Sequence, residues 1–177
     1  KAAAVLTALG SFAPCLLRCR RVARGQDRSL ANILRSLHVS ALAFFLFSYH
    51  VHEKGILVPL YPLLPLSLAE RDYAAAFSLL SAFTLLPLLH YEGLALAYGA
   101  SVALYVLAWY DHKPRRAFAA FAGLVPLHFM PLVVPPPARY PDLYPALVAL
   151  LGAAGFGLAY AAVALHEVKP WRRRKLD

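Results

Sequence analysis

The chain has 177 residues, of which 60% are hydrophobic and 15% are charged, and its mean hydropathy is +0.57. Soluble domains are about 45–50% apolar and about 25% charged, and so short a chain has too little interior to bury this much Leu, Ala and Phe. The composition therefore excludes an ordinary soluble domain. The net charge of +9 would suggest nucleic-acid binding in a soluble protein. Here the basic residues lie between apolar segments, so we expect membrane topology to explain them and no nucleic-acid partner.

Seven apolar segments follow one another along the chain. We interpret all of them as helices, because backbone polar groups in lipid must be paired within their own segment. The predicted fold class is therefore all-α, a polytopic transmembrane helical bundle of about seven spans. The predicted spans cover residues 2–17, 37–53, 55–69, 74–90, 93–110, 117–134 and 145–165.

The basic residues alternate with these segments. Fifteen of the 18 Lys and Arg residues lie in the loops or tail that one side of such a bundle would carry, and the other side holds Lys54, Arg139 and Lys1. Cytosolic loops are enriched in Lys and Arg. We therefore expect the fifteen-residue side, which includes the basic tail at residues 166–177, to be cytosolic. The corner at residues 50–54 would then face the lumenal or extracellular side.

The corner itself consists of His50, Val51, His52, Glu53 and Lys54 between two apolar runs. Ionisable groups at a membrane boundary are costly and are often functional. Residues 90–92 and the proline-rich loop at residues 135–142 are predicted to lie on the same side. His90, Glu92 and Asp142 are thus candidates for the same vestibule, although Asp142 also suits a turn or helix cap.

Four interpretations of the corner stay open on the residues alone. A metal site is disfavoured, because His50 and His52 are two residues apart and point to different faces of a helix. A second interpretation is a proton- or ion-coupled transporter, in which His and Glu relay protons. The absence of an internal repeat in the sequence disfavours it, because many transporters contain one. A third interpretation is a site for a phosphate-bearing lipid, with Lys54 and a histidine at the phosphate and Glu53 either at a hydroxylated head group or holding Lys54. The fourth is a charged pair that only caps a helix hairpin.

Several other residues have structural interpretations. Pro59, Pro62 and Pro65 predict either a broken helix that forms a cavity wall or a short, kinked helix. Gly152, Gly155 and Gly157 predict close helix packing. The turn around Glu70 is expected to be solvated. His38 is expected near the cytosolic end of its span, and His128 within its span is expected to be a packing residue.

Residues 44–57 closely resemble the signature of the endoplasmic-reticulum α-1,3-glucosyltransferases of asparagine-linked glycosylation, with Val51-His52-Glu53-Lys54 as its core. Weaker similarity extends over roughly residues 30–165, including residues 83–89, 92–94 and 140–143. Two branches share the core and add the first or the second glucose. His50 resembles the second-glucose branch, whereas residues 47–48 and the stretch after His90 resemble the first-glucose branch, which is favoured.

The resemblance implies a GT-C type transferase in the endoplasmic reticulum membrane, with its active site on the lumenal face and its C-terminal tail in the cytosol. It implies dolichyl-phosphate glucose as donor, a mannose-rich lipid-linked oligosaccharide as acceptor, membrane lipid as surroundings, and no metal or cofactor. It places His52 and Lys54 near the donor phosphate and Glu53 near the sugar, with His50 a second-rank candidate.

The family's general base is a carboxylate on its first lumenal loop, which this sequence lacks. We therefore expect residues 1–177 to be the C-terminal transmembrane portion of a longer multi-span enzyme, inactive alone, with the catalytic base outside it. The rival class is a transporter or lipid-handling membrane protein without covalent chemistry.

Overall fold

The computed structural model describes residues 2–24, 29–48, 52–67, 69–109 and 115–168, and the regular structure within these ranges is helical. In chain order the elements are α1 (Ala2–Ala23), α2 (Leu30–Phe47), the short 3-10 helix η1 (Glu53–Ile56), α3 (Leu57–Leu66), α4 (Arg71–Tyr91), α5 (Ala95–Trp109), α6 (Arg115–Leu124), α7 (Pro126–Val133) and α8 (Leu143–Val168). The predicted all-α class is confirmed for these residues.

Three segments are long and apolar enough to cross a membrane, among the residues described above. They are Leu30–Phe47, Arg71–Tyr91 and Leu143–Ala164, and α5 is a shorter apolar helix. Each of the seven predicted spans overlaps a helix. The number of membrane crossings, however, stays a prediction.

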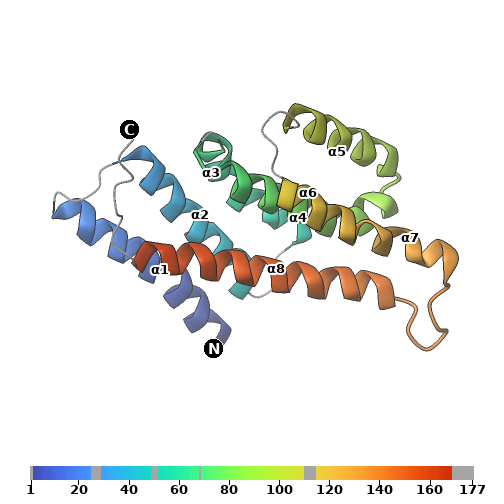
Figure 1. Cartoon of the computed structure of the whole chain (residues 1–177). Coiled ribbons are helices and arrows are strands. Elements are labelled where there is room, and N and C mark those ends of the chain that lie inside the picture. The colour runs from blue at the N-terminus through green and yellow to red at the C-terminus, as the bar shows by residue number, and fades with distance from the viewer. Residues whose placement is uncertain (1, 25–28, 49–51, 68, 110–114, 169–177) are drawn as a thin grey trace.

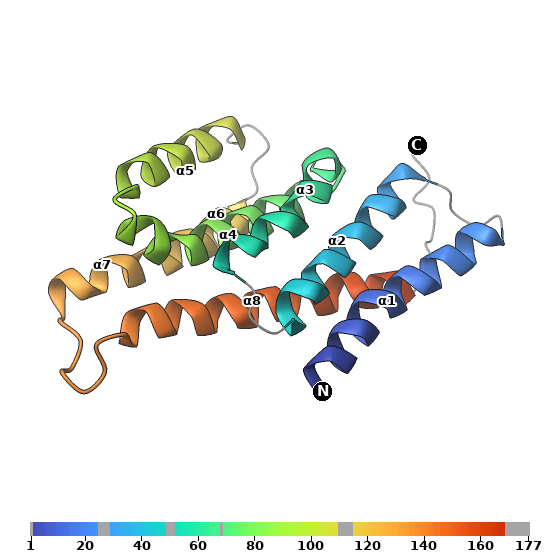
Figure 2. The ribbon, with the colours of Figure 1, turned by 180° about the vertical axis from the view of Figure 1, so that it is seen from behind.

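The long helix α8 runs along the lower side of the bundle, and α4 lies above it (Figures 1 and 2). Helix α8 packs against α1, α2, α4 and α7, whereas α4 packs against α3, α5, α6 and α8. Helix α1 lies along α2, and α5 lies on the opposite side of the bundle, where it packs mainly against α4. This arrangement brings the C-terminal halves of α2 and α4 beside the N-terminal half of α8.

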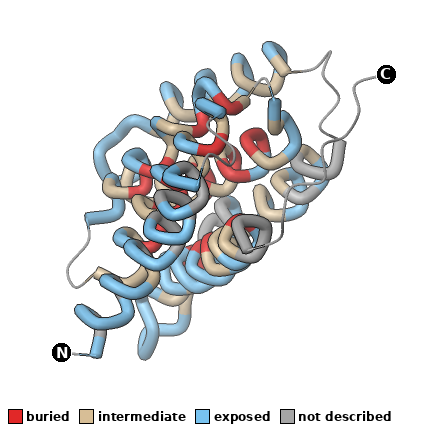
Figure 3. The backbone as a smooth tube through the Cα atoms, turned by 90° about the vertical axis from the view of Figure 1, so that its left-hand side faces the viewer, coloured by how far each residue is buried: buried red, intermediate tan, exposed pale blue. Residues whose placement is uncertain are grey.

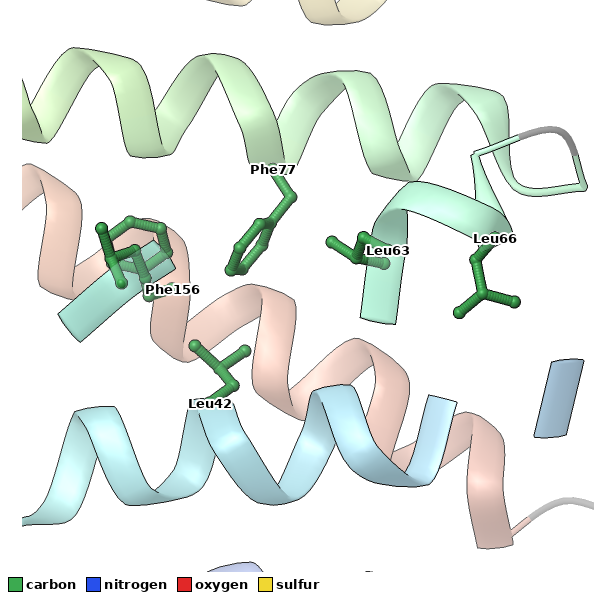
Figure 4. Packing of buried hydrophobic residues seen from close by; sticks show 6 residues of the cluster. Leu42, Leu63, Leu66, Phe77 and Phe156 are labelled. Carbon is green, nitrogen blue, oxygen red and sulfur yellow. The ribbon is translucent and has the colours of Figure 1, made fainter. Parts of the chain in front are cut away.

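The main apolar core forms where α2, α3, α4 and α8 meet. Figure 4 shows Phe77 of α4 pointing towards Phe156 of α8, with Leu42, Leu63 and Leu66 around them. The two phenylalanine rings pack with their centroids 5.4 Å apart. Aromatic pairs at this spacing contribute attraction beyond the area that they bury.

The outside of the bundle is rich in exposed apolar side chains. Figure 3 shows the buried residues concentrated between the helices and the exposed ones along their outer faces. Leu96 and Leu104 of α5 and Leu158 of α8 are among the large apolar side chains that are exposed. Because contiguous apolar surface of this kind is unfavourable in water, the distribution fits a lipid environment.

The predicted boundaries of the second span are wrong. The helix begins at Leu30 instead of residue 37 and ends at Phe47 instead of residue 53. Arg35, which we placed in a loop, therefore lies inside α2. Its charge is compensated by Glu70, which is 35 residues further along the chain and cannot be matched to it from local sequence.

The proline-rich third span is a short helix. After η1, α3 runs for ten residues with Pro62 and Pro65 inside it. Ten helical residues extend about 15 Å, half of the hydrocarbon thickness of a bilayer. The predicted sixth span is likewise divided, at Val125, into α6 and α7, because Pro126 has no N–H to donate to the preceding turn.

Candidate functional site

The predicted polar corner lies where η1 meets the ends of α2, α4 and α8. His52, Glu53 and Lys54 are described and exposed, whereas His50 lies outside the described residues. His52 has an extended backbone (φ −70°, ψ 142°) and precedes the 3-10 turn, in which the Gly55 N–H donates to the His52 carbonyl over 2.7 Å. This turn fixes the directions in which three consecutive polar side chains leave the backbone.

Lys54 forms an ion pair with Glu92 at the C-terminal end of α4. Its ammonium donates to Glu92 Oε1 over 2.8 Å, and the two side chains are 52% and 34% exposed. The alternative in which Glu53 holds Lys54 is thus replaced by a pair with Glu92. The pair also brings together two turns that the sequence assigned to the same side of the membrane.

Glu53 instead lines a cavity of about 270 Å³ that is otherwise mostly apolar. The lining comes from α2, η1, α4 and α8: Phe45, Leu46, Glu53, Thr84, Pro87, Pro145, Val148, Ala149, Gly152, Ala153 and Phe156. Helix α3 contributes no residue to this lining, so the interpretation of the proline-rich segment as a cavity wall is wrong for this cavity. The segment forms a short helix, and the predicted kink stays a prediction.

The sequence analysis did not identify the residues of α8 that line the cavity, although their spacing in the sequence indicates a common helix face. Residues 145, 148, 149, 152, 153 and 156 recur at helical spacing and therefore lie on one face. Small residues at 149, 152 and 153 leave space beside Phe156. This pattern predicts a helix face, but the opposing residues come from three other elements that are distant in sequence.

Close packing of α4 against α8 forms one side of the cavity. A Cβ atom at Gly155 would lie 2.7 Å from Leu80 Cδ2, and one at Gly152 would clash with Thr84 Cγ2. The prediction of close packing is confirmed at these two glycines. It is wrong at Gly157, where no described residue outside the surrounding stretch of α8 comes within 4 Å of such a Cβ atom.

The other candidates for the vestibule do not line the cavity. His90 and Asp142 are exposed, and the Asp142 carbonyl accepts the Ala146 N–H at the start of α8, as a helix-capping residue does. Within the described part of the chain, no group of three or more His, Cys, Asp or Glu residues is arranged to hold a metal ion. The side chain of His128 is not among those described.

A second polar cluster lies at the opposite ends of α2 and α4. Arg35 donates one hydrogen bond to the Glu70 carboxylate and another to Asn32 Oδ1. The Glu70 side chain is half-buried, and its charge is paired with that of Arg35. The expectation of a merely solvated turn at Glu70 is therefore wrong. Nearby, His38 is 1% exposed and its ring nitrogens lie 2.8 Å from the Pro59 carbonyl oxygen and 2.7 Å from the Tyr73 hydroxyl.

Comparison with known proteins gives a consistent family assignment. The sequence profile of the ALG6, ALG8 glycosyltransferase family matches residues 1–163. The chain is 34% identical over 128 residues to the probable dolichyl pyrophosphate Man9GlcNAc2 alpha-1,3-glucosyltransferase of Schizosaccharomyces pombe, over 66% of this chain and 25% of that protein. It is 32% identical over 144 residues to the Drosophila melanogaster protein of the same name, over 75% of this chain and 30% of that protein.

A relative from the second branch also matches. The Drosophila melanogaster probable dolichyl pyrophosphate Glc1Man9GlcNAc2 alpha-1,3-glucosyltransferase is 33% identical over 128 residues, over 71% of this chain and 24% of that protein. The chain thus spans less than a third of the length of each of these three relatives.

Proposed function

This chain belongs to the ALG6, ALG8 glycosyltransferase family, and from that premise we propose that it is the C-terminal, donor-binding portion of an α-1,3-glucosyltransferase. The enzyme transfers glucose from dolichyl-phosphate glucose to the lipid-linked oligosaccharide used for protein N-glycosylation. The names of its relatives support Man9GlcNAc2 linked to dolichyl pyrophosphate as the acceptor, which corresponds to addition of the first glucose.

The observation that carries this proposal is a mostly apolar cavity lined by Glu53, the direct neighbour of His52 and Lys54 in the chain. The cavity places Glu53 among apolar side chains of α2, α4 and α8, and Lys54 follows Glu53 directly in η1. A lipid phosphate needs both kinds of surface, apolar for the isoprenoid chain and cationic for the phosphate. In this proposal His52 and Lys54 contact the phosphate, and Glu53 accepts a hydrogen bond from a glucose hydroxyl.

In the proposed glucosyl transfer, the Lys54 ammonium stabilises the departing dolichyl phosphate. An acceptor hydroxyl oxygen attacks the anomeric carbon of glucose, the bond from that carbon to the phosphate oxygen breaks, and its electron pair leaves with dolichyl phosphate. The phosphate changes from a diester to a monoester and gains negative charge, which the Lys54 ammonium stabilises most strongly in the transition state. The hydroxyl proton goes to a carboxylate that we assign to the part of the enzyme outside these residues.

The proposed setting is the endoplasmic reticulum membrane, with the cavity on the lumenal side and residues 166–177 in the cytosol. The polar clusters support this orientation indirectly. Lys54 and Glu92 meet at one end of the bundle, and Arg35 and Glu70 meet at the other, as the alternation of basic loops predicts.

Steady-state transfer by the full-length protein tests the donor site. We expect Lys54→Ala to lower kcat/KM for dolichyl-phosphate glucose about 10–100-fold and His52→Ala about 10-fold, as loss of a hydrogen bond to a charged group does. Arg172→Ala, a basic residue of the tail, serves as the matched control and should transfer glucose normally. Unchanged transfer in both the Lys54 and His52 variants, with normal expression, would contradict the donor-phosphate role.

A further inference from the structure

The Lys54–Glu92 pair joins two backbone turns that are each fixed by their own hydrogen bonds. On one side, η1 holds Lys54 in its 3-10 turn. On the other, α4 ends in a Schellman motif: Gly93 has φ +75°, the Gly93 N–H donates to the His90 carbonyl over 3.1 Å, and the Leu94 N–H donates to the Leu89 carbonyl over 2.7 Å. Glu92 is the capping residue of this motif, so the backbone sets its position at the end of α4.

Glu92 is unfavourably placed for the stability of its own helix. The C-terminal end of a helix carries partial negative charge and favours cations, so a carboxylate there is repelled. Lys54 compensates both the carboxylate and the helix end. An exposed ion pair of this kind contributes little to folding stability, so stability alone does not explain an acidic residue at this position.

We infer that Glu92 is a positioning residue that holds the Lys54 ammonium beside the cavity, at the place where the donor phosphate binds. This inference rests on the proposed function, because it assigns a role within the donor site. An ammonium group has three N–H donors, and Glu92 Oε1 accepts one of them. The pair therefore restricts a flexible four-carbon side chain while it leaves donors for a phosphate oxygen.

The carboxylates of Glu53 and Glu92 have different surroundings, which indicates different roles. Glu53 lines the cavity, and Glu92 pairs with the lysine outside it. Because Lys54 pairs with Glu92 and not with Glu53, the Glu53 carboxylate stays at the cavity, where the proposed function places a glucose hydroxyl.

The test measures donor kinetics and product binding in the full-length protein. Glu92→Gln removes the charge and keeps the shape, Lys54→Ala removes the cation, and the double variant measures their coupling. Asp72→Asn is the matched control, because Asp72 is an exposed acid in the first turn of the same helix. The readouts are KM for dolichyl-phosphate glucose, kcat, KM for the acceptor, Kd for dolichyl phosphate, and the melting temperature.

We expect Glu92→Gln to raise KM for the donor and Kd for dolichyl phosphate about 3–10-fold, in the range of one weakened charge-assisted contact. The acceptor KM, the melting temperature and the Asp72→Asn control should stay at wild-type values. In the Lys54→Ala background, Glu92→Gln should have no further effect, because the residue acts through the lysine.

Two results would overturn the inference. One is unchanged donor KM and dolichyl phosphate Kd in Glu92→Gln; the other is an effect of equal size when Lys54 is already Ala, which would mean that Glu92 contacts the ligand itself. Wild-type protein that binds dolichyl phosphate through Lys54 and Glu92 but transfers no glucose would contradict the proposed function and leave the positioning role intact.

Discussion

At the scale of single residues, the ion pair of Lys54 and Glu92 joins η1 to the C-terminal end of α4. The resemblance over residues 51–54 singled out His52, Glu53 and Lys54, and all three lie at the meeting point of four elements. The sequence left two roles open for Glu53, and it placed Glu92 only on the same side. Which carboxylate meets the lysine depends on a Schellman turn 38 residues away, and local sequence does not encode that distance.

His38 shows the same limit. The sequence placed it near the cytosolic end of its span, whereas it lies well inside α2, with two specific partners from α3 and α4. A carbonyl oxygen only accepts, so Nδ1 of the neutral ring donates to the Pro59 carbonyl. Nε2 then accepts the hydrogen bond from the Tyr73 hydroxyl. The His38 ring thus connects α2 to α3 and to α4 by hydrogen bonds.

Tyr73→Phe tests the hydrogen bond between the Tyr73 hydroxyl and His38. The substitution leaves Nε2 of a buried imidazole without its donor, so we expect the free energy of unfolding in detergent to fall by about 1–3 kcal/mol. Tyr61→Phe is the control, because Tyr61 is 71% exposed. Equal stability of the two variants, measured by thermal unfolding, would contradict the assigned hydrogen bond.

At the scale of elements, each predicted apolar segment overlaps a described helix, but the helix boundaries depend on contacts with residues that are distant in the sequence. The second span was placed too late because Arg35 was assumed to lie outside the membrane segment. Its pairing with Glu70 and Asn32 lets α2 continue through this position. The prolines of α3 coincide with a short helix, yet they did not reveal that the cavity is lined by α2, η1, α4 and α8 instead.

The α4–α8 contact provides a prediction at this scale. Gly152→Ala would push a methyl group against Thr84, a β-branched residue whose hydroxyl donates to the Ser81 carbonyl over 3.0 Å and resists rotation. We expect a loss of about 1–3 kcal/mol in unfolding free energy from overpacking. Because Gly152 also lines the cavity, the donor KM should rise.

Gly157→Ala is the matched control for this contact. Among the described residues, no atom outside its own stretch of helix lies within 4 Å of its added Cβ, and alanine has a higher helix propensity than glycine. We expect its melting temperature to equal or exceed that of the wild type. If Gly157→Ala destabilised the protein as much as Gly152→Ala, the packing account of α8 would be contradicted.

At the scale of the whole molecule, the two ends of the bundle differ in character. One end combines a cavity with the Lys54–Glu92 pair, and the other holds the Arg35–Glu70 pair and His38. The alternation of basic loops predicted which turns share an end of the bundle. Two turns share an end when an even number of predicted spans separates them. The cavity itself was not predictable, since its lining residues are drawn from elements that are far apart in the chain.

The central claim is that this family member transfers glucose from a lipid phosphate to an unglucosylated acceptor. The most direct measurement supplies the full-length protein with dolichyl-phosphate glucose and, in parallel, with Man9GlcNAc2 or Glc1Man9GlcNAc2 linked to dolichyl pyrophosphate. We expect glucose to be added to the first acceptor and not to the second. Transfer only to the second would contradict the assignment of the branch, and transfer to neither by well-folded protein would contradict the claim itself.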